Sequence, residues 1–336
     1  MSKTFIIAEL SANHNHNLQT AIDSIKAAAE IGVDAVKIQT YTADTLTLNC
    51  EKDDFILKDG LWAGKSLYEL YQEAYTPWEW HEKLFETARE AGVMMFSTPF
   101  DNTAVDLLES LGNPIYKIAS FEIMDTELIR YAASKGKPMI MSTGVATEQE
   151  IEEAIEACRE VGNNDITLLK CTSEYPAKIS DANLAMIPDM RERFGVKVGL
   201  SDHSMGSLVP IVAVALGATM VEKHFIIDRK IGGPDSAFSM DKKEFGQLVK
   251  DIRAAESSLG KVDYSLTPAK EKARQSAGRS LYVAKDIKEG EVITRDNVRC
   301  VRPGYGLHPR NFSKIIGKHV NKVFYFGDRL IEDSIE

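Results

Sequence analysis

The sequence predicts a (β/α)8 barrel (TIM barrel, α/β class) followed by a small, mostly β domain, and three observations lead to this fold class. Short apolar runs alternate with longer helical segments eight times over about 250 residues, as eight strand–helix units require. Several helical segments end in glycine just before the next apolar run, which marks a helix C-terminus. The alternative, an open doubly wound sheet, lacks its usual GxGxxG after the first strand.

The expected elements follow one another regularly along the chain, with one interruption. We expect strands at 5–8, 35–38, 94–97, 115–118, 139–142, 166–169, 196–200 and 218–221. We expect helices at 18–30, 78–91, 103–111, 125–135, 148–161 and 208–216. Residues 40–80, rich in Tyr and Trp, break this rhythm after the second strand. Long loops at that face of a barrel often shape a substrate pocket, although the aromatics could equally pack over the barrel rim.

The composition changes after the expected barrel. Residues 1–258 are assigned to the barrel, 259–275 to a polar linker, and 276–336 to a compact module of short apolar runs and turns. A module of about sixty residues is marginally stable by itself, so we expect it to dock onto another unit.

Bulk properties exclude several classes of protein. A net charge of −10 argues against a general nucleic-acid-binding or anionic-membrane surface. The four cysteines have no CxxC spacing and indicate reduced thiols rather than a disulfide framework. No stretch resembles a signal peptide or reaches the length of a transmembrane helix. We therefore predict a soluble cytoplasmic protein without nucleic-acid or membrane partners.

Two histidines follow the last two expected strands. His203 comes just after the strand at 196–200 and His224 just after the strand at 218–221, with a helical segment between them. Adjacent parallel strands point the same way, so both imidazoles should emerge on one face. A lone histidine is more often a surface or core residue, but the paired placement favours a divalent-metal site open to water and substrate.

The other strand ends carry groups suited to an anion. Two lysines and several small hydroxyls form a predicted cradle for phosphate and carboxylate groups, namely Lys37, Lys117, Ser120, Ser142 and Ser201. Glu9 is an acid between apolar neighbours, so its pKa is open to tuning for acid–base work or for orienting water. The alternative for Glu9 is a structural salt bridge to a neighbouring lysine.

These motifs resemble a known family across nearly the whole chain. IIAELSANHN, AVKIQTYT, FSTPF, YKIAS, MSTG, CTSEYP, GLSDHS, VEKHF and GPD are similar to motifs of the sialic acid synthase (nonulosonate synthase) family. The C-terminal AGRSLYVAKDIKEGEVIT and VRPGYG resemble the antifreeze-protein-like (SAF) domain. The insertion GLWAGKSLYELYQEAYTPWEW and the form KIQTYTADTLT look most like the branch of the family that forms pseudaminic acid.

The resemblance implies an activity and a role for each matching residue. The family condenses phosphoenolpyruvate with an acetamido sugar and releases phosphate; for the pseudaminic branch the diacetamido sugar is 2,4-diacetamido-2,4,6-trideoxy-L-altrose. A divalent cation, Mn2+ before Mg2+ or Co2+, would be bound by His203 and His224. The implied catalytic residues are Glu9, Lys37 and Lys117. The implied substrate-binding residues are Gln39, Thr98, Ser120, Ser142, Ser173, Tyr175, Ser201, Asp235 and Arg302.

The resemblance has further implications at Arg302 and Ser173. Arg302 matches an arginine that the C-terminal module delivers to the partner's active site, so a domain-swapped homodimer is implied. Ser173 stands where the sialic acid enzymes have Asn, which fits a different sugar.

Other functions stay open from the sequence. The sugar could be N-acetylmannosamine, giving sialic acid, or a diacetamido-trideoxy-mannose, giving legionaminic acid. A non-catalytic carbohydrate- or ice-binding protein, suggested by the C-terminal module, would leave the charged strand ends without a purpose. A barrel aldolase that uses a lysine Schiff base is the third alternative.

Overall fold

The computed structural model describes residues 3–58 and 62–336 and divides into two compact units, Met1–Gly260 and Lys261–Glu336. Gly60 and Leu61, which belong to the motif of the insertion, lie outside the described residues. In the described ranges no helix combines the length and the apolar content needed to cross a membrane. All four cysteines are free thiols.

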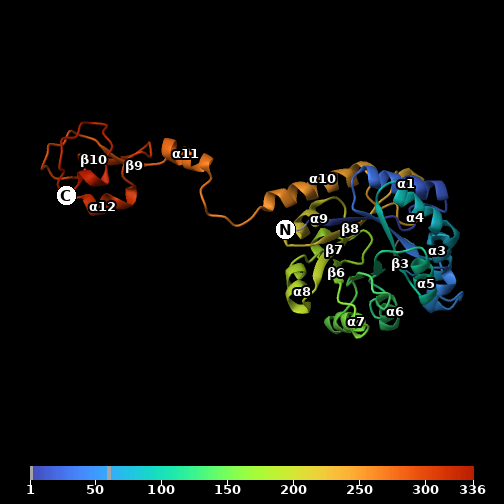
Figure 1. Cartoon of the computed structure of the whole chain (residues 1–336). Coiled ribbons are helices and arrows are strands. Elements are labelled where there is room, and N and C mark those ends of the chain that lie inside the picture. The colour runs from blue at the N-terminus through green and yellow to red at the C-terminus, as the bar shows by residue number, and fades with distance from the viewer. Residues whose placement is uncertain (1–2, 59–61) are drawn as a thin grey trace. The chain divides into compact units, whose positions relative to one another are not determined.

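The first unit is a closed barrel of eight parallel strands, as predicted (Figure 1). Its strands are β1 (Phe5–Glu9), β2 (Ala35–Thr40), β3 (Met94–Pro99), β4 (Tyr116–Ile118), β5 (Met139–Ser142), β6 (Ile166–Cys171), β7 (Lys197–Asp202) and β8 (Met220–His224). Pairing of β1 with β8, with Glu9 opposite His224, closes the barrel. Most strands run one to three residues further than predicted at their C-terminal ends, so many predicted site residues lie on the strand ladder rather than in loops.

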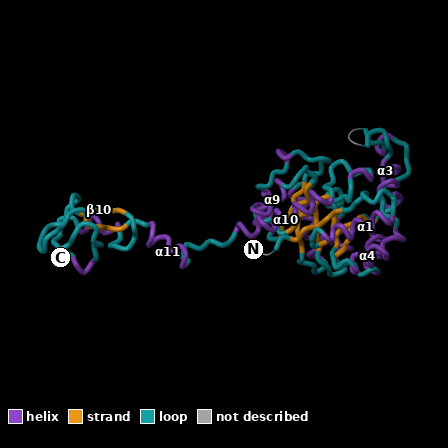
Figure 2. Tube along the Cα trace, turned by 90° about the horizontal axis from the view of Figure 1, so that it is seen from above, coloured by secondary structure: helices purple, strands orange, loops and turns teal. Residues whose placement is uncertain are grey.

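Helices cover the outside of the barrel, with the strands in the centre of the unit (Figure 2). They are α1 (Leu18–Glu30), α4 (His81–Glu90), α5 (Asn102–Ser110), α6 (Thr126–Ala133), α7 (Glu148–Glu160), α8 (Met186–Phe194), α9 (Leu208–Ala215) and α10 (Lys242–Leu259). The helix predicted at 78–91 begins as a 3-10 turn, Trp78–Trp80, before α4. Helix α8 was not predicted because Pro188 reads as a helix breaker, yet it lies in the first turn, where proline is tolerated.

The insertion after β2 forms its own short helices, α2 (Ala43–Leu46) and α3 (Leu67–Ala74), with α3 at the periphery of the barrel unit (Figure 2). Ser66 and Glu69 close the start of α3 as a capping box, each side chain bonding to the other's backbone N–H. Residues 43–46 and 67–74 of the predicted aromatic loop are therefore helical.

The second unit is small and has its own core. Helix α11 (Pro268–Ala277) occupies much of the segment that we predicted as a linker, and α10 reaches Leu259, one residue past the predicted end of the barrel. Strands β9 (Ser280–Val283) and β10 (Val298–Val301) pair antiparallel, and α12 (Phe312–Ile315) follows. Its buried apolar core is formed by Leu281, Val283, Ile287, Ile293, Val298, Ile315, Val320, Phe324 and Leu330.

Candidate active site

Two layers of side chains fill the inside of the barrel. Near the N-terminal ends of the strands lies an apolar layer of Ile7, Ala35, Phe96, Ile115, Ile140 and Leu169. Side chains alternate along a strand, so the residue two positions later points the same way. After these six residues the later residue is Glu9, Lys37, Thr98, Lys117, Ser142 or Cys171, and Ser201 on β7 and Glu222 on β8 occupy the matching positions. These eight side chains form a polar layer. The barrel therefore places the predicted site residues at its C-terminal mouth, where barrel enzymes have their active sites.

Four buried charges dominate the polar layer. The Lys37 ammonium lies 2.7 Å from a carboxylate oxygen of Glu9 and 3.5 Å from Glu222, and Lys117 lies 3.1 Å from the same Glu222 oxygen. All four side chains are at most 5% exposed. Glu222 was not among the predicted site residues, although its position two residues before His224 placed it on the same side of the strand.

The two carboxyl groups have opposite electrostatic environments. Burial raises the pKa of Glu9, and the nearby Lys37 offsets this only in part. Burial also acts on Glu222, but Lys117 and Lys37 outweigh it and hold the pKa of that carboxyl below its ordinary value. Glu222 therefore stays ionised between the lysines, while Glu9 is the carboxyl that can exchange a proton. Two acids with separated pKa values are typical of acid–base sites.

Other predicted residues join the same network. Lys37 donates a hydrogen bond to the Thr98 hydroxyl at 3.1 Å, and the Gln39 amide donates to Glu9 at 3.2 Å. The Ser120 hydroxyl accepts from the Gly144 backbone N–H at 3.2 Å. A Cβ added to Gly144 would lie 2.1 Å from the Ser173 Oγ and 2.9 Å from the Ser120 Oγ. A larger residue at position 144 would therefore displace these two hydroxyls.

Besides Glu9 Oε2, which is ion-paired with Lys37, three buried polar atoms of this mouth have no hydrogen-bond partner in the described part of the chain: Ser142 Oγ, Glu222 Oε2 and His224 Nδ1. Buried polar atoms are normally partnered, and those that are not need an explanation such as a ligand. The mouth thus has unused hydrogen-bonding capacity where the cationic lysines converge.

The two predicted metal ligands face each other, and their donor chemistry fits a divalent cation. The rings of His203 and His224 are 5.3 Å apart between centroids. His203 Nδ1 lies 2.8 Å from the Thr172 carbonyl oxygen, so it donates there and leaves Nε2 free, which is the usual second-shell arrangement of a ligand histidine. Burial, with neighbouring positive groups, holds the pKa of His224 well below its ordinary value, so that imidazole is neutral as ligation requires. Burial acts the same way on His203, but its contacts with the Cys171 thiol and the Thr172 carbonyl outweigh burial and raise its pKa, so His203 would have to release a proton to bind a metal.

No group of three or more His, Cys, Asp and Glu side chains converges as a metal site within residues 3–58 and 62–336. A cation held by these two imidazoles would therefore need oxygen ligands from water or substrate.

Aromatic and acidic groups line the histidine side of the mouth. The Tyr175 ring is 4.3 Å from that of His203, and the Phe238 ring is 5.0 Å from that of His224. Asp235 Oδ2 lies 3.8 Å from His224 Nδ1 and accepts from the Ala12 backbone N–H at 3.3 Å. The predicted residues Tyr175 and Asp235 thus lie beside the histidines, and Phe238 was missed because nothing in its sequence context distinguishes it from core.

Glu122 is a second acid that the sequence did not reveal. It follows β4 in the loop after Ser120, and burial raises its pKa to about 7 although Lys117 acts in the other direction. Its Oε2 has no hydrogen-bond partner in the described residues. A carboxyl group that titrates near neutral pH is suited to proton transfer.

Arg302 is the one predicted site residue outside the barrel unit. It directly follows β10 in the C-terminal unit, and its side chain is exposed. Its role toward a barrel stays a prediction.

The fold and site together define a class of protein: a TIM-barrel protein whose mouth combines two buried lysines, two buried carboxyl groups with opposite pKa shifts and two imidazoles. The family model described as the NeuB family matches residues 24–264, and the SAF domain model matches residues 278–324. The chain belongs to the NeuB family and carries a C-terminal SAF domain, which confirms the predicted resemblance.

Individual relatives span almost the whole chain. A pseudaminic acid synthase of Campylobacter jejuni is 51% identical over 99% of this chain and 96% of its own length. An N,N'-diacetyllegionaminic acid synthase of Legionella pneumophila is 37% identical over 99% of this chain and 94% of its own length. The crystal structure of a putative spore coat polysaccharide biosynthesis protein E from Chromobacterium violaceum has 27% identity and a TM-score of 0.80, covering 99% of this chain and 100% of that one.

Proposed function

We propose that the protein is a pseudaminic acid synthase, which condenses phosphoenolpyruvate with 2,4-diacetamido-2,4,6-trideoxy-L-altrose and water to give pseudaminic acid and phosphate. The observation that carries the proposal is the convergence of Glu9, Lys37, Lys117, His203 and His224 at one barrel mouth. These residues converge in a chain whose sequence is 51% identical to that of a pseudaminic acid synthase. The lower identity to a legionaminic acid synthase favours the altrose-derived sugar over its alternatives.

The lysines account for binding of the anionic substrate. Phosphoenolpyruvate carries a phosphate and a carboxylate, and Lys37 and Lys117 supply two buried ammonium groups with the Ser120, Ser142 and Ser201 hydroxyls nearby. Such fixed partners hold the enol carbon against the sugar, so that the reaction proceeds as within one molecule. The new carbon–carbon bond forms between the enol carbon and the aldehyde carbon of the open-chain sugar.

The carboxyl groups account for the second half of the reaction. When the enol carbon has attacked, the former aldehyde oxygen takes up a proton from solvent and becomes a hydroxyl. Positive character develops at the carbon that bears the phosphate, and water adds there. Glu9, whose pKa is raised by burial, accepts the proton of that water, while ionised Glu222 holds both lysine side chains in place. The tetrahedral adduct then expels phosphate by cleavage of its carbon–oxygen bond, leaving the 2-keto acid.

His203 and His224 would hold the divalent cation, Mn2+ before Mg2+ or Co2+, and when bound it would polarise the aldehyde oxygen of the sugar. We expect Mn2+ binding, measured by calorimetry on metal-free protein, to disappear in the His203→Ala/His224→Ala double variant. Undiminished Mn2+ binding by that variant would refute this assignment.

The substrate assignment is tested by the mass of the product. Phosphoenolpyruvate is supplied with the diacetamido altrose, with N-acetylmannosamine, or with the diacetamido-trideoxy-mannose, and phosphate release is measured together with the product mass. We expect the nine-carbon diacetamido acid from the altrose sugar at the highest kcat/KM. A higher kcat/KM for either other sugar reassigns the product, and borohydride trapping of a lysine–pyruvate adduct would instead indicate the Schiff-base aldolase.

We also propose a homodimer in which Arg302 of the partner subunit completes each active site. The C-terminal unit carries 15 Lys and Arg against 10 Asp and Glu, whereas the rest of the chain carries 25 against 40, so the two units have opposite charge. Exposed apolar side chains also follow several strands on the catalytic face, among them Phe121, Met124, Ile179 and Leu208.

Mixing two inactive variants tests this exchange. An Arg302→Ala chain has an intact barrel, and a Glu9→Gln chain has an intact Arg302. After unfolding and joint refolding, a mixed dimer would regain one complete site, so we expect activity well above that of either variant refolded alone. No recovery in a mixture that forms dimers would exclude the exchange of Arg302.

A further inference from the structure

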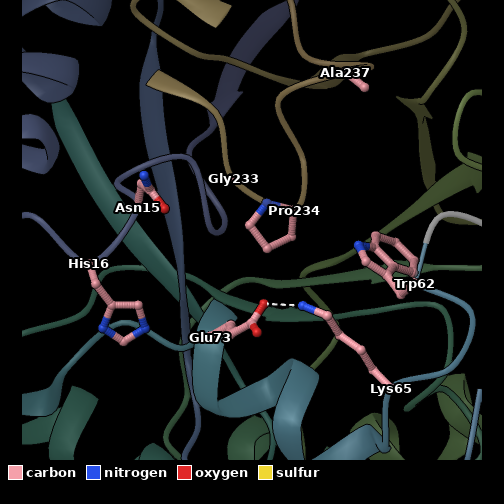
Figure 3. A pocket seen from close by; sticks show the side chains of 8 residues that line it. All are labelled: Asn15, His16, Trp62, Lys65, Glu73, Gly233, Pro234 and Ala237. Atoms are coloured by element: carbon pink, nitrogen blue, oxygen red, sulfur yellow. Dashed lines mark hydrogen bonds and ion pairs between the residues drawn. The ribbon is translucent and has the colours of Figure 1, made fainter. Parts of the chain in front are cut away.

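A pocket of about 470 Å3 lies next to the site, between the insertion and two loops of the catalytic face (Figure 3). The insertion contributes Trp62, Lys65 and Glu73, and the loop after β1 contributes Asn15 and His16. The loop after β8 contributes Gly233, Pro234 and Ala237. None of these residues was assigned a role above, and pockets of this size hold small molecules.

Two walls of the pocket continue into the active site. The loop after β8 gives Pro234 and Ala237 to the pocket, while the intervening Asp235 is buried beside His224. At the other wall, the Trp62 ring lies 6.2 Å from the Tyr175 ring, and the Tyr175 ring in turn lies 4.3 Å from the His203 ring, tilted by 40°. A molecule whose reacting end lies at the histidines can therefore extend along Tyr175 toward Trp62.

The loop after β1 is held in an unusual conformation at this pocket. Asn15 and His16 have φ angles of 46° and 52°, in the left-handed region that few residues other than glycine adopt. The Asn15 amide donates to the Ile231 carbonyl at 3.2 Å, and the His16 ring packs at 5.2 Å against Tyr75 of the insertion. These contacts fix the loop between the two other walls of the pocket, which is the kind of local constraint found at binding sites.

The lining suits an uncharged polar group rather than an anion. Lys65 and Glu73 form an ion pair of 2.5 Å whose charges cancel (Figure 3). Around it lie one indole ring, one proline ring, an amide and an imidazole. An acetamido group has matching chemistry, since its methyl packs on an aromatic face and its amide forms hydrogen bonds. A sugar phosphate would instead meet the Glu73 carboxylate.

We propose that this pocket is the subsite that receives the end of the sugar remote from its aldehyde, and that it selects a neutral end bearing a second acetamido group. The lysines of the polar layer take the anionic substrate, so the neutral sugar occupies the histidine side and extends toward Trp62. The inference rests on the proposed function for the identity of the sugar. It assigns the selection between one and two acetamido groups to the insertion.

The test separates binding from turnover. The sugars are reduced to their alditols, which lack the reacting aldehyde, and are titrated calorimetrically into the full-length protein in the presence of phosphoenolpyruvate. In Trp62→Ala we expect the diacetamido alditol to bind about 30-fold more weakly, since a hydrophobic pocket discriminates by about that factor. The alditol of N-acetylmannosamine should change by less than about threefold, and Trp62→Tyr should restore most of the loss.

The ion pair provides a second, independent arm with a matched control. Glu73→Gln leaves Lys65 uncompensated, so we expect about tenfold tighter binding of the alditol of N-acetylmannosamine 6-phosphate. Lys83 and Glu86 form a comparable exposed pair of 2.6 Å on α4, and Glu86→Gln should change no affinity. An equal effect of Trp62→Ala on both neutral alditols, or none, would overturn the proposal.

Failure of the two proposals can be told apart. Wild-type protein that releases no phosphate with the diacetamido sugar, yet binds its alditol through Trp62, refutes the proposed function and retains the subsite. Wild-type protein that turns over this sugar, with Trp62→Ala unaffected in alditol binding, retains the function and refutes the subsite.

Discussion

The apolar and polar layers of the barrel come from neighbouring positions of the same strands, two residues apart, yet one is built of hydrocarbon side chains and the other of charged and polar ones. The apolar layer is filled by side chains such as Phe96 and Leu169, both fully buried. The polar layer buries four charges, and its Ser142 Oγ and Glu222 Oε2 have no hydrogen-bond partner in the described chain. Burying apolar surface stabilises a fold, whereas burying charges costs stability unless they are well paired. The apolar layer thus stabilises the barrel, and the polar layer supplies the groups for chemistry at a cost in stability.

The polar layer is kept in place by the strands rather than by its own interactions. Glu9 lies opposite Lys37 and His224 in the ladders of the neighbouring strands, so backbone hydrogen bonds fix its position. Sites on rigid strands hold reacting groups more precisely than loops do. Substitutions in the polar layer should therefore remove function with little loss of stability, and substitutions in the apolar layer should do the reverse.

The largest effect is expected for Glu9→Gln in the polar layer. Glutamine keeps the shape of the side chain but cannot accept a proton, so turnover should fall at least about 1,000-fold, as for the loss of a general base. Phosphoenolpyruvate affinity should stay within about threefold, because the lysines that hold the anion remain. Turnover is measured by phosphate release and affinity by calorimetry.

Glu109→Gln is the matched control for this substitution. Glu109 pairs with Lys137 at 2.7 Å on the outside of the barrel, so its substitution should leave turnover unchanged. Near-normal turnover of Glu9→Gln would mean that the Glu9–Lys37 pair serves only the structure.

The next effect is the reverse case, Leu169→Ala in the apolar layer. Leu169 is fully buried in the barrel interior, so the substitution removes apolar contacts and leaves a cavity. The free energy of unfolding should fall by about 4 kcal/mol, as for other buried leucines. Denaturant unfolding measures this loss, and kcat of the folded fraction should stay within about twofold. A loss of kcat without a loss of stability would erase the distinction between the layers.

Much of this arrangement could be predicted from the sequence. Eight apolar runs with glycine-terminated helices between them determined the barrel, and strand-end positions located Glu9, Lys37, Lys117, His203 and His224. The reason is physical: alternation and the parallel direction of the strands carry the residue after each apolar run to the same mouth. These signals are local, because the sequence of each strand alone identifies the residue at its end.

Other features depend on contacts between distant segments and could not be read locally. Glu222 lies inside a strand that resembles a core strand, and its role follows from two lysines that are 105 and 185 residues away in sequence. The pocket at Trp62 is formed by the insertion and the loops after β1 and β8. The packing of Phe238 on His224 depends on the path of the loop after β8. Helix α11 was missed because its polar, exposed surface has no apolar face to signal it.

A third prediction concerns His81, a buried residue whose two ring nitrogens both have hydrogen-bond partners. The His81 ring is fully buried, with Nδ1 3.2 Å from the Pro77 carbonyl and Nε2 2.8 Å from the Thr40 hydroxyl. Burial lowers the pKa of His81 to about 4, from 6.5 in an exposed histidine. The folded protein resists protonation of His81. The contribution of His81 to the free energy of unfolding is therefore constant above pH 6.5 and is lost as the pH falls from 6.5 to 4. The loss amounts to about 3 kcal/mol.

His81→Gln measures this contribution directly. Glutamine cannot take up the proton, so the difference in unfolding free energy between wild type and variant should shrink by about 3 kcal/mol between pH 7 and pH 4. Urea unfolding at each pH gives both values. A difference that does not vary with pH would show that His81 does not resist protonation in the fold.

The smallest effect is expected for Ser142→Ala. This substitution tests whether the buried Ser142 hydroxyl binds substrate. The Ser142 Oγ is buried at the mouth with no partner in the described residues, so its removal should raise the free energy of unfolding by about 1 kcal/mol. Phosphoenolpyruvate affinity should fall about tenfold, because one hydrogen bond to the anion is lost.

Ser24 on α1 is the control for this substitution. Its hydroxyl is also buried and also has no hydrogen-bond partner in the described residues, but it lies among core residues of the helix. Ser24→Ala should give the same gain in denaturant unfolding without any change in affinity. If both variants bind phosphoenolpyruvate as wild type does, the free hydroxyl at the mouth is not reserved for substrate.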